Sequence, residues 1–108
     1  MTVLPDGMMV SNRTTHAINL FDPVHGSIVI PTDGEPVRVK VWYDSISKYL
    51  TRVQFVRGEC NLPRQEPGLY LIVSSTVKRT FPERQDLIVP INMVREGRVV
   101  TACQAFGL

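Results

Sequence analysis

Short runs of apolar residues, several of them closed by glycine or proline, recur along this chain and predict strands. Residues 18–21 and 27–30 are two such runs, and the Asp-Pro-Val-His-Gly segment that joins them predicts a hairpin. Residues 8–10 are also apolar and form either an edge strand or a tail. The first third of the chain therefore predicts two or three short strands.

Residues 37–43 alternate most cleanly, with a valine at every second position, and they predict a half-exposed strand. Residues 44–48 are polar and predict a turn or a loose excursion before residues 49–56, which alternate again. Residues 58–68 hold two glycines and two prolines and predict a loop. The polar face of the first strand carries Arg38, Lys40 and Trp42.

Residues 69–73 are continuously apolar, which predicts a central strand that is buried on both faces. Ser74 and Ser75 follow this strand and offer an N-cap for a helix. We expect that helix over residues 76–81, because the next residue is Pro82, which cannot continue it.

The last third of the chain predicts further short strands. Residues 87–89 form an apolar run that we expect to stop at Pro90, and residues 91–94 are either another strand or one helical turn. Glu96-Gly97 predicts a turn, and residues 99–106 predict a final strand.

Together these elements predict a mainly β fold, a small barrel or sandwich of seven to eight short strands with one short helix. No linker or repeat divides the chain, so residues 1–108 are expected to form a single β-rich domain. With 44% hydrophobic and 20% charged residues, the chain has the balance of an ordered globular protein.

The formal net charge is +2, without any block of lysine and arginine, so no strong footprint for a nucleic-acid polymer is present. No apolar run approaches the roughly 18 residues that a membrane helix needs. The first residues also lack the pattern of a signal peptide, and we expect a cytoplasmic protein that does not bind a membrane.

Two cysteines, Cys60 and Cys103, form no Cys-x-x-Cys motif and have no histidine at ligand spacing. In a cytoplasmic protein such thiols are expected to be reduced and structural. Acidic residues and histidines do not cluster either, so we expect no metal site and no cofactor.

Arg84 and Asp86 lie two residues apart beside a predicted buried strand, where a charge needs a partner or a ligand. In one interpretation they form a structural ion pair. In the other, Arg84 joins Arg79 or Arg95 to bind an anion, because the planar guanidinium suits phosphate or carboxylate. The sequence leaves both interpretations open.

Four other residues are candidates for a ligand site, and each has a structural alternative. Ser74 and Ser75 form either an anion cradle or a plain N-cap. His16 is either a binding residue or a turn residue bonded to the backbone, and Trp42 either stacks on a partner or covers the core. The chain has no Gly-x-Ser-x-Gly motif and no glycine-rich loop, so we do not expect an enzyme.

Several segments resemble a family of small proteins encoded by bacteriophages and prophages. They are NRTTHAINL from residue 12, LIVSSTV from residue 71, PERQDLIVP from residue 82 and VREGRVV from residue 94. The chain departs from the family pattern at Thr15, where the family often has proline. The resemblance implies a phage origin and a setting in the host cytoplasm, without implying a mechanism.

Two functions follow as hypotheses. The first is a non-enzymatic binding protein that holds a small anionic ligand, such as a nucleotide, around Ser74, Arg84, Asp86 and Arg95. Such a protein could counter host defence by sequestering an immune nucleotide signal. The alternative is a virion or assembly component that acts through protein–protein interfaces, and a homo-oligomer is open under either hypothesis.

Overall fold

The computed structural model describes residues 1–108, apart from the side chain of Glu59. Strand makes up 51% of the chain and helix 7%. Over the described residues the strands are β1 (Thr2–Val3), β2 (Met9–Asn12), β3 (Ile18–Asp22), β4 (Gly26–Ile30), β5 (Lys40–Ser47), β6 (Leu50–Val56), β7 (Leu69–Ile72), β8 (Leu87–Glu96) and β9 (Val99–Gly107). The helices are α1 (Ser75–Thr80) and a short 3-10 helix, η1 (Arg57–Glu59).

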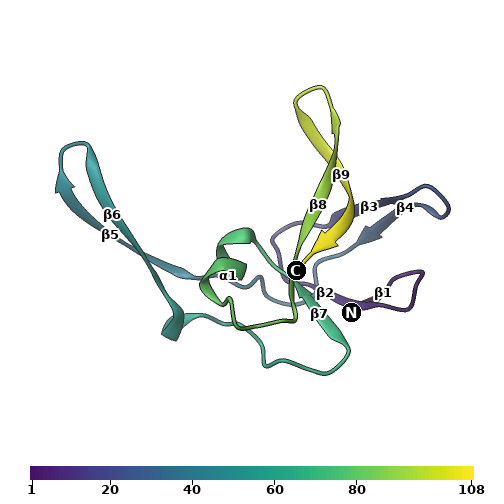
Figure 1. The fold of residues 1–108 in the computed structure, drawn as a ribbon, viewed down its shortest axis with the longest axis horizontal. Helices are drawn as coiled ribbons and strands as arrows, with labels where there is room; N and C mark the ends of the chain where they lie inside the picture. The colour runs from purple at the N-terminus through teal and green to yellow at the C-terminus, as the bar shows by residue number, and fades with distance from the viewer.

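Seven strands form one curled sheet in the order β1-β2-β7-β8-β9-β3-β4. The pairs β2–β7 and β7–β8 are parallel, as is the short contact of β3 with β9, whereas β8–β9 and β3–β4 are antiparallel hairpins. A parallel bridge between Asn12, at the end of β2, and Thr32, just after β4, joins the second strand of this order to the last. The sheet is therefore a nearly closed, barrel-like structure, which confirms the expected mainly β fold (Figure 1).

The buried side chain of Asn12 fastens this closure. Its Nδ2 donates to the carbonyl of Ile30 at 3.0 Å and to the carbonyl of His16 at 2.9 Å, and its Oδ1 accepts from the backbone N–H of Thr14 at 3.0 Å. The Asn12 backbone carbonyl also accepts from the N–H of Asp33 at 2.8 Å. One amide side chain thus bonds the end of β2 to the end of β4, a role that the sequence pattern did not predict.

Two hydrophobic clusters lie on opposite faces of the sheet. The barrel interior contains Leu4, Val10, Leu20, Ile30, Ile72, Ile88 and Cys103. The second cluster, beneath α1, contains Val37, Leu71, Val73, Val77, Phe81 and Leu87. Because successive residues of a strand point to opposite faces, β7 contributes to both clusters, as its continuous apolar sequence predicted.

The helix forms close to where the sequence predicted it. The Ser74 hydroxyl accepts from the N–H of Val77 at 3.3 Å and caps the helix, and Val77 and Phe81 bury one face against the sheet. None of the described helices has the length and apolar character that crossing a membrane requires.

Two strand predictions are corrected by the structure. Residues 8–10 are not an edge strand or a tail, because β2 lies between β1 and β7 and its last three residues are buried. The run from residue 87 does not stop at Pro90 either, since β8 continues to Glu96. Pairing with β7 ends at Ile88, so at Pro90 the strand has no neighbour on that side, and a missing N–H is tolerated there.

The largest difference concerns residues 37–56. Val37 is buried beneath the helix and precedes the strand, and β5 begins at Lys40 and runs through the segment that was expected to turn. Strands β5 and β6 pair only with each other and form a hairpin that we call the arm (Figure 1). Residues 41–55 of the arm are exposed, apart from Val41, which is half-buried, whereas a half-exposed strand was expected.

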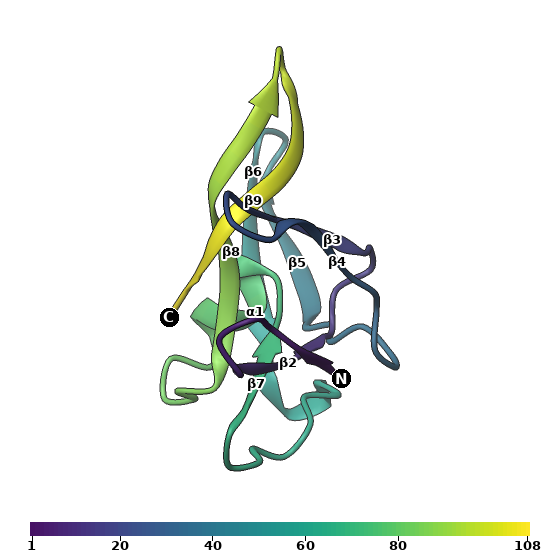
Figure 2. The same cartoon turned by 90° about the vertical axis from the view of Figure 1, so that its right-hand side faces the viewer.

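The arm and the β8–β9 hairpin both project from the body of the molecule (Figures 1 and 2). The principal extents are 52 × 38 × 21 Å, and the radius of gyration is 15.9 Å. A compact domain of this length has a radius of gyration of about 13 Å. The chain is therefore more extended than its length requires.

Candidate functional site

Arg84 and Asp86, the central pair of the expected anion pocket, are bonded to each other. Arg84 Nε donates to Asp86 Oδ1 at 2.8 Å, and Arg84 Nη2 donates to Asp86 Oδ2 at 2.7 Å. Nη2 also donates to the carbonyl of Pro63 at 2.9 Å. Asp86 is 3% exposed, and its hydrogen bonds raise the pKa of the Arg84 guanidinium. The geometry corresponds to the structural interpretation, a bidentate pair that ties the 58–68 loop to the sheet.

The structure does not assemble the pocket expected from Ser74, Arg84, Asp86 and Arg95. Arg95 lies near the far end of β8, opposite Val100, whereas Asp86 precedes the first residue of that strand. Nine residues of extended chain span roughly 30 Å, so the two side chains lie at opposite ends of the strand. Asp86 and Arg95 are close in sequence but far apart in space, because β8 does not end at Pro90 and continues past Arg95.

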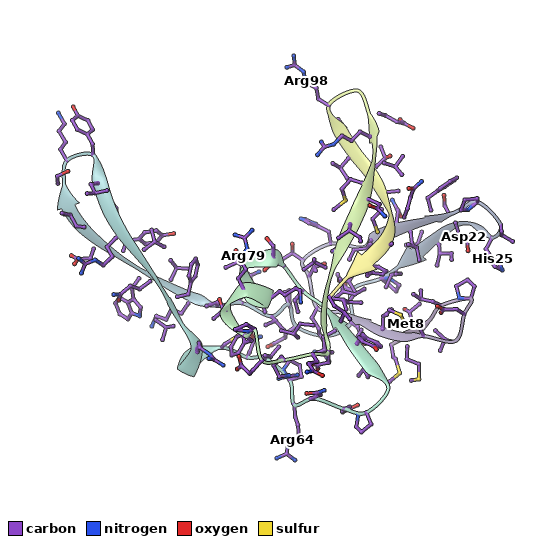
Figure 3. The ribbon with its side chains drawn as sticks, in the orientation of Figure 1. Met8, Asp22, His25, Arg64, Arg79 and Arg98 are labelled. Carbon is purple, nitrogen blue, oxygen red and sulfur yellow. The ribbon has the colours of Figure 1, made fainter. Side chains whose placement is uncertain are left out.

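The remaining arginine of that expectation, Arg79, is exposed on α1 (Figure 3). Figure 3 also shows Arg98 at the tip of the β8–β9 hairpin and Arg64 at the opposite edge of the view. Arg95 lies two residues before the hairpin loop that carries Arg98, so it is near that tip. Pro63, whose carbonyl Arg84 contacts, is next to Arg64. The basic side chains named as anion ligands are thus distributed over the molecule.

Three of the predicted residues do line one cleft. His16, Ser74 and Ser75 border a hollow of about 410 Å³ together with Thr14 and with apolar side chains of β8 and its neighbours. Two of its hydroxyls are bonded within the chain. The Ser74 oxygen caps the helix, and the Thr14 hydroxyl lies 2.7 Å from Asn12 Oδ1. The cleft is therefore mainly apolar, with the His16 ring and the Ser75 hydroxyl at its border.

The arm presents two faces of different chemistry, because residues paired directly across a hairpin share a face. The charged face holds Lys40, Trp42, Asp44, Arg52, Gln54 and Val56, and the Lys40 ammonium lies 4.8 Å from the centre of the Trp42 ring. The uncharged face holds Val41, Tyr43, Ser45, Thr51, Val53 and Phe55.

Most of the uncharged face is open to solvent in a single chain. Tyr43 is 71% exposed, Phe55 50% and Val53 48%. An isolated two-stranded hairpin is at best marginally stable in water, and contiguous exposed apolar surface marks interaction sites. Trp42, which the sequence singled out, belongs to the other face. The pattern of alternation could have identified the uncharged face, but only after the pairing of β5 with β6 was known.

The base of the arm is fixed to the body by several contacts. The Asn61 side chain accepts from the N–H of Arg38 and donates to the carbonyl of Pro36, both at 2.9 Å. The Arg57 guanidinium pairs with Glu83 and lies 4.8 Å from the ring centre of Phe81. These contacts connect the base of the arm to the rest of the chain.

No protein-family model, curated protein sequence or solved structure matches the chain.

Proposed function

We propose that this protein is a non-enzymatic subunit of a phage particle, or of its assembly, that acts through protein–protein interfaces. The observation that carries the proposal is the uncharged face of the arm, which leaves Tyr43, Val53 and Phe55 without cover in the single chain. A face of this composition resembles the centre of an interface, which is depleted of charge and rich in aromatic residues.

The total surface supports the same proposal. The chain exposes 7458 Å². A compact monomer of 12.2 kDa exposes about 6,100 Å², so the excess is about 1,400 Å². A standard protein–protein interface buries about 800 Å² on each partner. The whole chain thus exposes more surface than a compact monomer, and the projecting arm is part of that surface.

The phage context of the proposal comes from the sequence segments that resemble phage and prophage proteins, NRTTHAINL and PERQDLIVP among them. Small β-rich subunits with projecting hairpins are suited to assembly, because a hairpin supplies side-chain faces and backbone edges to a neighbour.

The test is to quantify this chain by mass spectrometry in particles purified from the phage or prophage that carries its gene. We expect the wild-type chain in the particles at a fixed stoichiometry. Val53→Lys, which places a charge on the uncharged face, should reduce incorporation strongly. Gln54→Lys is the matched control, because it adds the same charge to the opposite face. Absence of the wild-type chain from particles and from assembly intermediates would contradict the proposal.

A second candidate function is the binding of a small anionic ligand, such as a nucleotide, in the cleft of His16, Ser74 and Ser75. The observation that favours it is that His16 and Ser75, whose side chains can donate hydrogen bonds to an anion, border the same hollow. The protein would be incubated with nucleotide second messengers, separated from the excess and heated to release bound ligand. Retention that His16→Ala removes, and that His25→Ala on the distant β3–β4 hairpin leaves unchanged, would support this function.

A further inference from the structure

We infer that the partner of the uncharged face is a second copy of this chain, with the two arms stacked face to face about a two-fold axis. The inference rests on the proposed function, since it identifies the partner of the same surface. Three features of the arm carry it, namely its charge pattern, its area and its shape.

The charge pattern permits a contact between identical faces. In a two-fold contact each patch meets its own copy, so a charge near the axis is brought close to the same charge of the partner. The described residues of the uncharged face are Val41, Tyr43, Ser45, Thr51, Val53 and Phe55, and none of them is Asp, Glu, Lys, Arg or His. On the other face Asp44 and Arg52 lie directly opposite each other within one arm. Stacking through the uncharged faces therefore opposes no like charges, and both ions stay in solvent.

The exposed surface is also consistent with a self-contact. The chain as a whole exposes about 1,400 Å² more than a compact monomer, and the arm is one of the two hairpins that project from its body. Neither strand of the arm pairs with the main sheet, and a two-stranded hairpin alone is marginal in water. A second arm laid on the first makes a four-stranded, two-layer sandwich in which the layers are about 10 Å apart, the usual spacing of packed sheets.

The shape of the molecule leaves room for this arrangement. The arm projects away from the barrel-like sheet, so its tip lies clear of the body (Figure 1). Its base is bonded to the rest of the chain through Asn61 and Arg57. Tyr43 and Val53 are directly opposed in the middle of the uncharged face and would lie at the centre of the contact.

The experiment is light scattering on the purified full chain over a series of concentrations, with Val53→Lys and Gln54→Lys as matched variants. We expect a mass of twice 12.2 kDa for the wild type and for Gln54→Lys, and half of that mass for Val53→Lys. Circular dichroism of both variants shows whether each one keeps the fold. A wild type that stays monomeric, or a dimer that Val53→Lys leaves intact, overturns the inference.

Site-specific oxidation gives a second measurement that does not depend on introducing a charge. Val53→Cys and Gln54→Cys place a thiol on the two faces at adjacent positions. Under mild oxidation we expect Val53→Cys to form a disulfide-linked dimer and Gln54→Cys to stay mainly monomeric, whereas equal linkage would contradict stacking through the uncharged face. If the wild type is monomeric yet Val53→Lys is still lost from particles, the partner is a different protein. That result overturns the self-contact and leaves the proposed function standing.

Discussion

The guanidinium of Arg84 holds the carboxylate of Asp86 by two parallel hydrogen bonds, from Nε to Oδ1 at 2.8 Å and from Nη2 to Oδ2 at 2.7 Å. The same Nη2 bonds the carbonyl of Pro63 at 2.9 Å, so one side chain joins the start of β8 to the loop before β7. Bidentate pairs of this kind fix geometry as well as charge. The pair is therefore part of the fold, and this assignment can be tested by mutation.

Arg84→Ala is expected to lower the free energy of unfolding by about 3–5 kcal/mol, because it leaves the buried Asp86 carboxylate without its partner. Arg84→Ala combined with Asp86→Asn should recover part of the loss, since the uncompensated charge is then removed. Thermal and urea unfolding of the single and double variants measure these differences.

Arg79→Ala is the matched control for that series, because Arg79 is an exposed arginine on α1 and should be nearly neutral. Added phosphate should change neither the melting temperature of the wild type nor that of Arg84→Ala. A variant Arg84→Ala of undiminished stability, or a wild type stabilised by phosphate through Arg84, would show that the arginine serves a ligand instead of the fold.

The closure of the barrel is expected to depend on Asn12. Asn12→Ala leaves the Ile30 carbonyl without its buried donor, which should cost about 1–3 kcal/mol of unfolding free energy. Asn19→Ala provides the comparison, because its side chain makes one exposed hydrogen bond to the Thr101 carbonyl and should cost less than about 1 kcal/mol. If urea unfolding shows equal losses of unfolding free energy for the two variants, the closure of the barrel does not depend on Asn12.

The two thiols should differ in reactivity. Cys103 is buried in the barrel, and burial raises the pKa of its thiol, whereas Cys60 is half-buried beside the 58–68 loop. Because the thiolate is the reactive form, a thiol reagent at neutral pH should label Cys60 first and Cys103 only after unfolding. Mass spectrometry of the unreduced protein should find both as free thiols. Rapid labelling of Cys103 in the folded protein would contradict its position in the core.

The sequence was sufficient for those parts of the fold that local pattern determines. The continuous apolar run of β7 predicted burial on two faces, and Ser74 and Pro82 marked the limits of α1, because caps and helix breakers act within a few residues. The sequence was insufficient at Pro90. Whether a strand can continue through a proline depends on whether a neighbouring strand needs the missing N–H as a donor, and local sequence does not show this.

The candidate site was harder to predict, because it depends on pairing between distant segments. Arg95 was grouped with Arg84 by sequence distance, but β8 separates them along its whole length. Trp42 was chosen as an exposed aromatic residue between basic ones, yet the uncharged face is formed by its neighbour Tyr43 with Val53 across the hairpin. That face appears only when the register of β5 and β6 is known.

The most direct test of the account is oxidative footprinting of the wild-type protein at increasing concentration, with Tyr43 compared with Tyr49. In a single chain Tyr43 is 71% exposed, and Tyr49 at the arm's tip is 89% exposed, so both should be labelled when the protein is dilute. Because a second arm would cover Tyr43 and Phe55, increasing concentration should protect both of them, while Tyr49 stays reactive. The contrary result would be equal labelling of Tyr43 and Tyr49 at every concentration, together with a wild type that light scattering finds to be monomeric throughout. That result would contradict the claim that the arm's uncharged face binds a second copy.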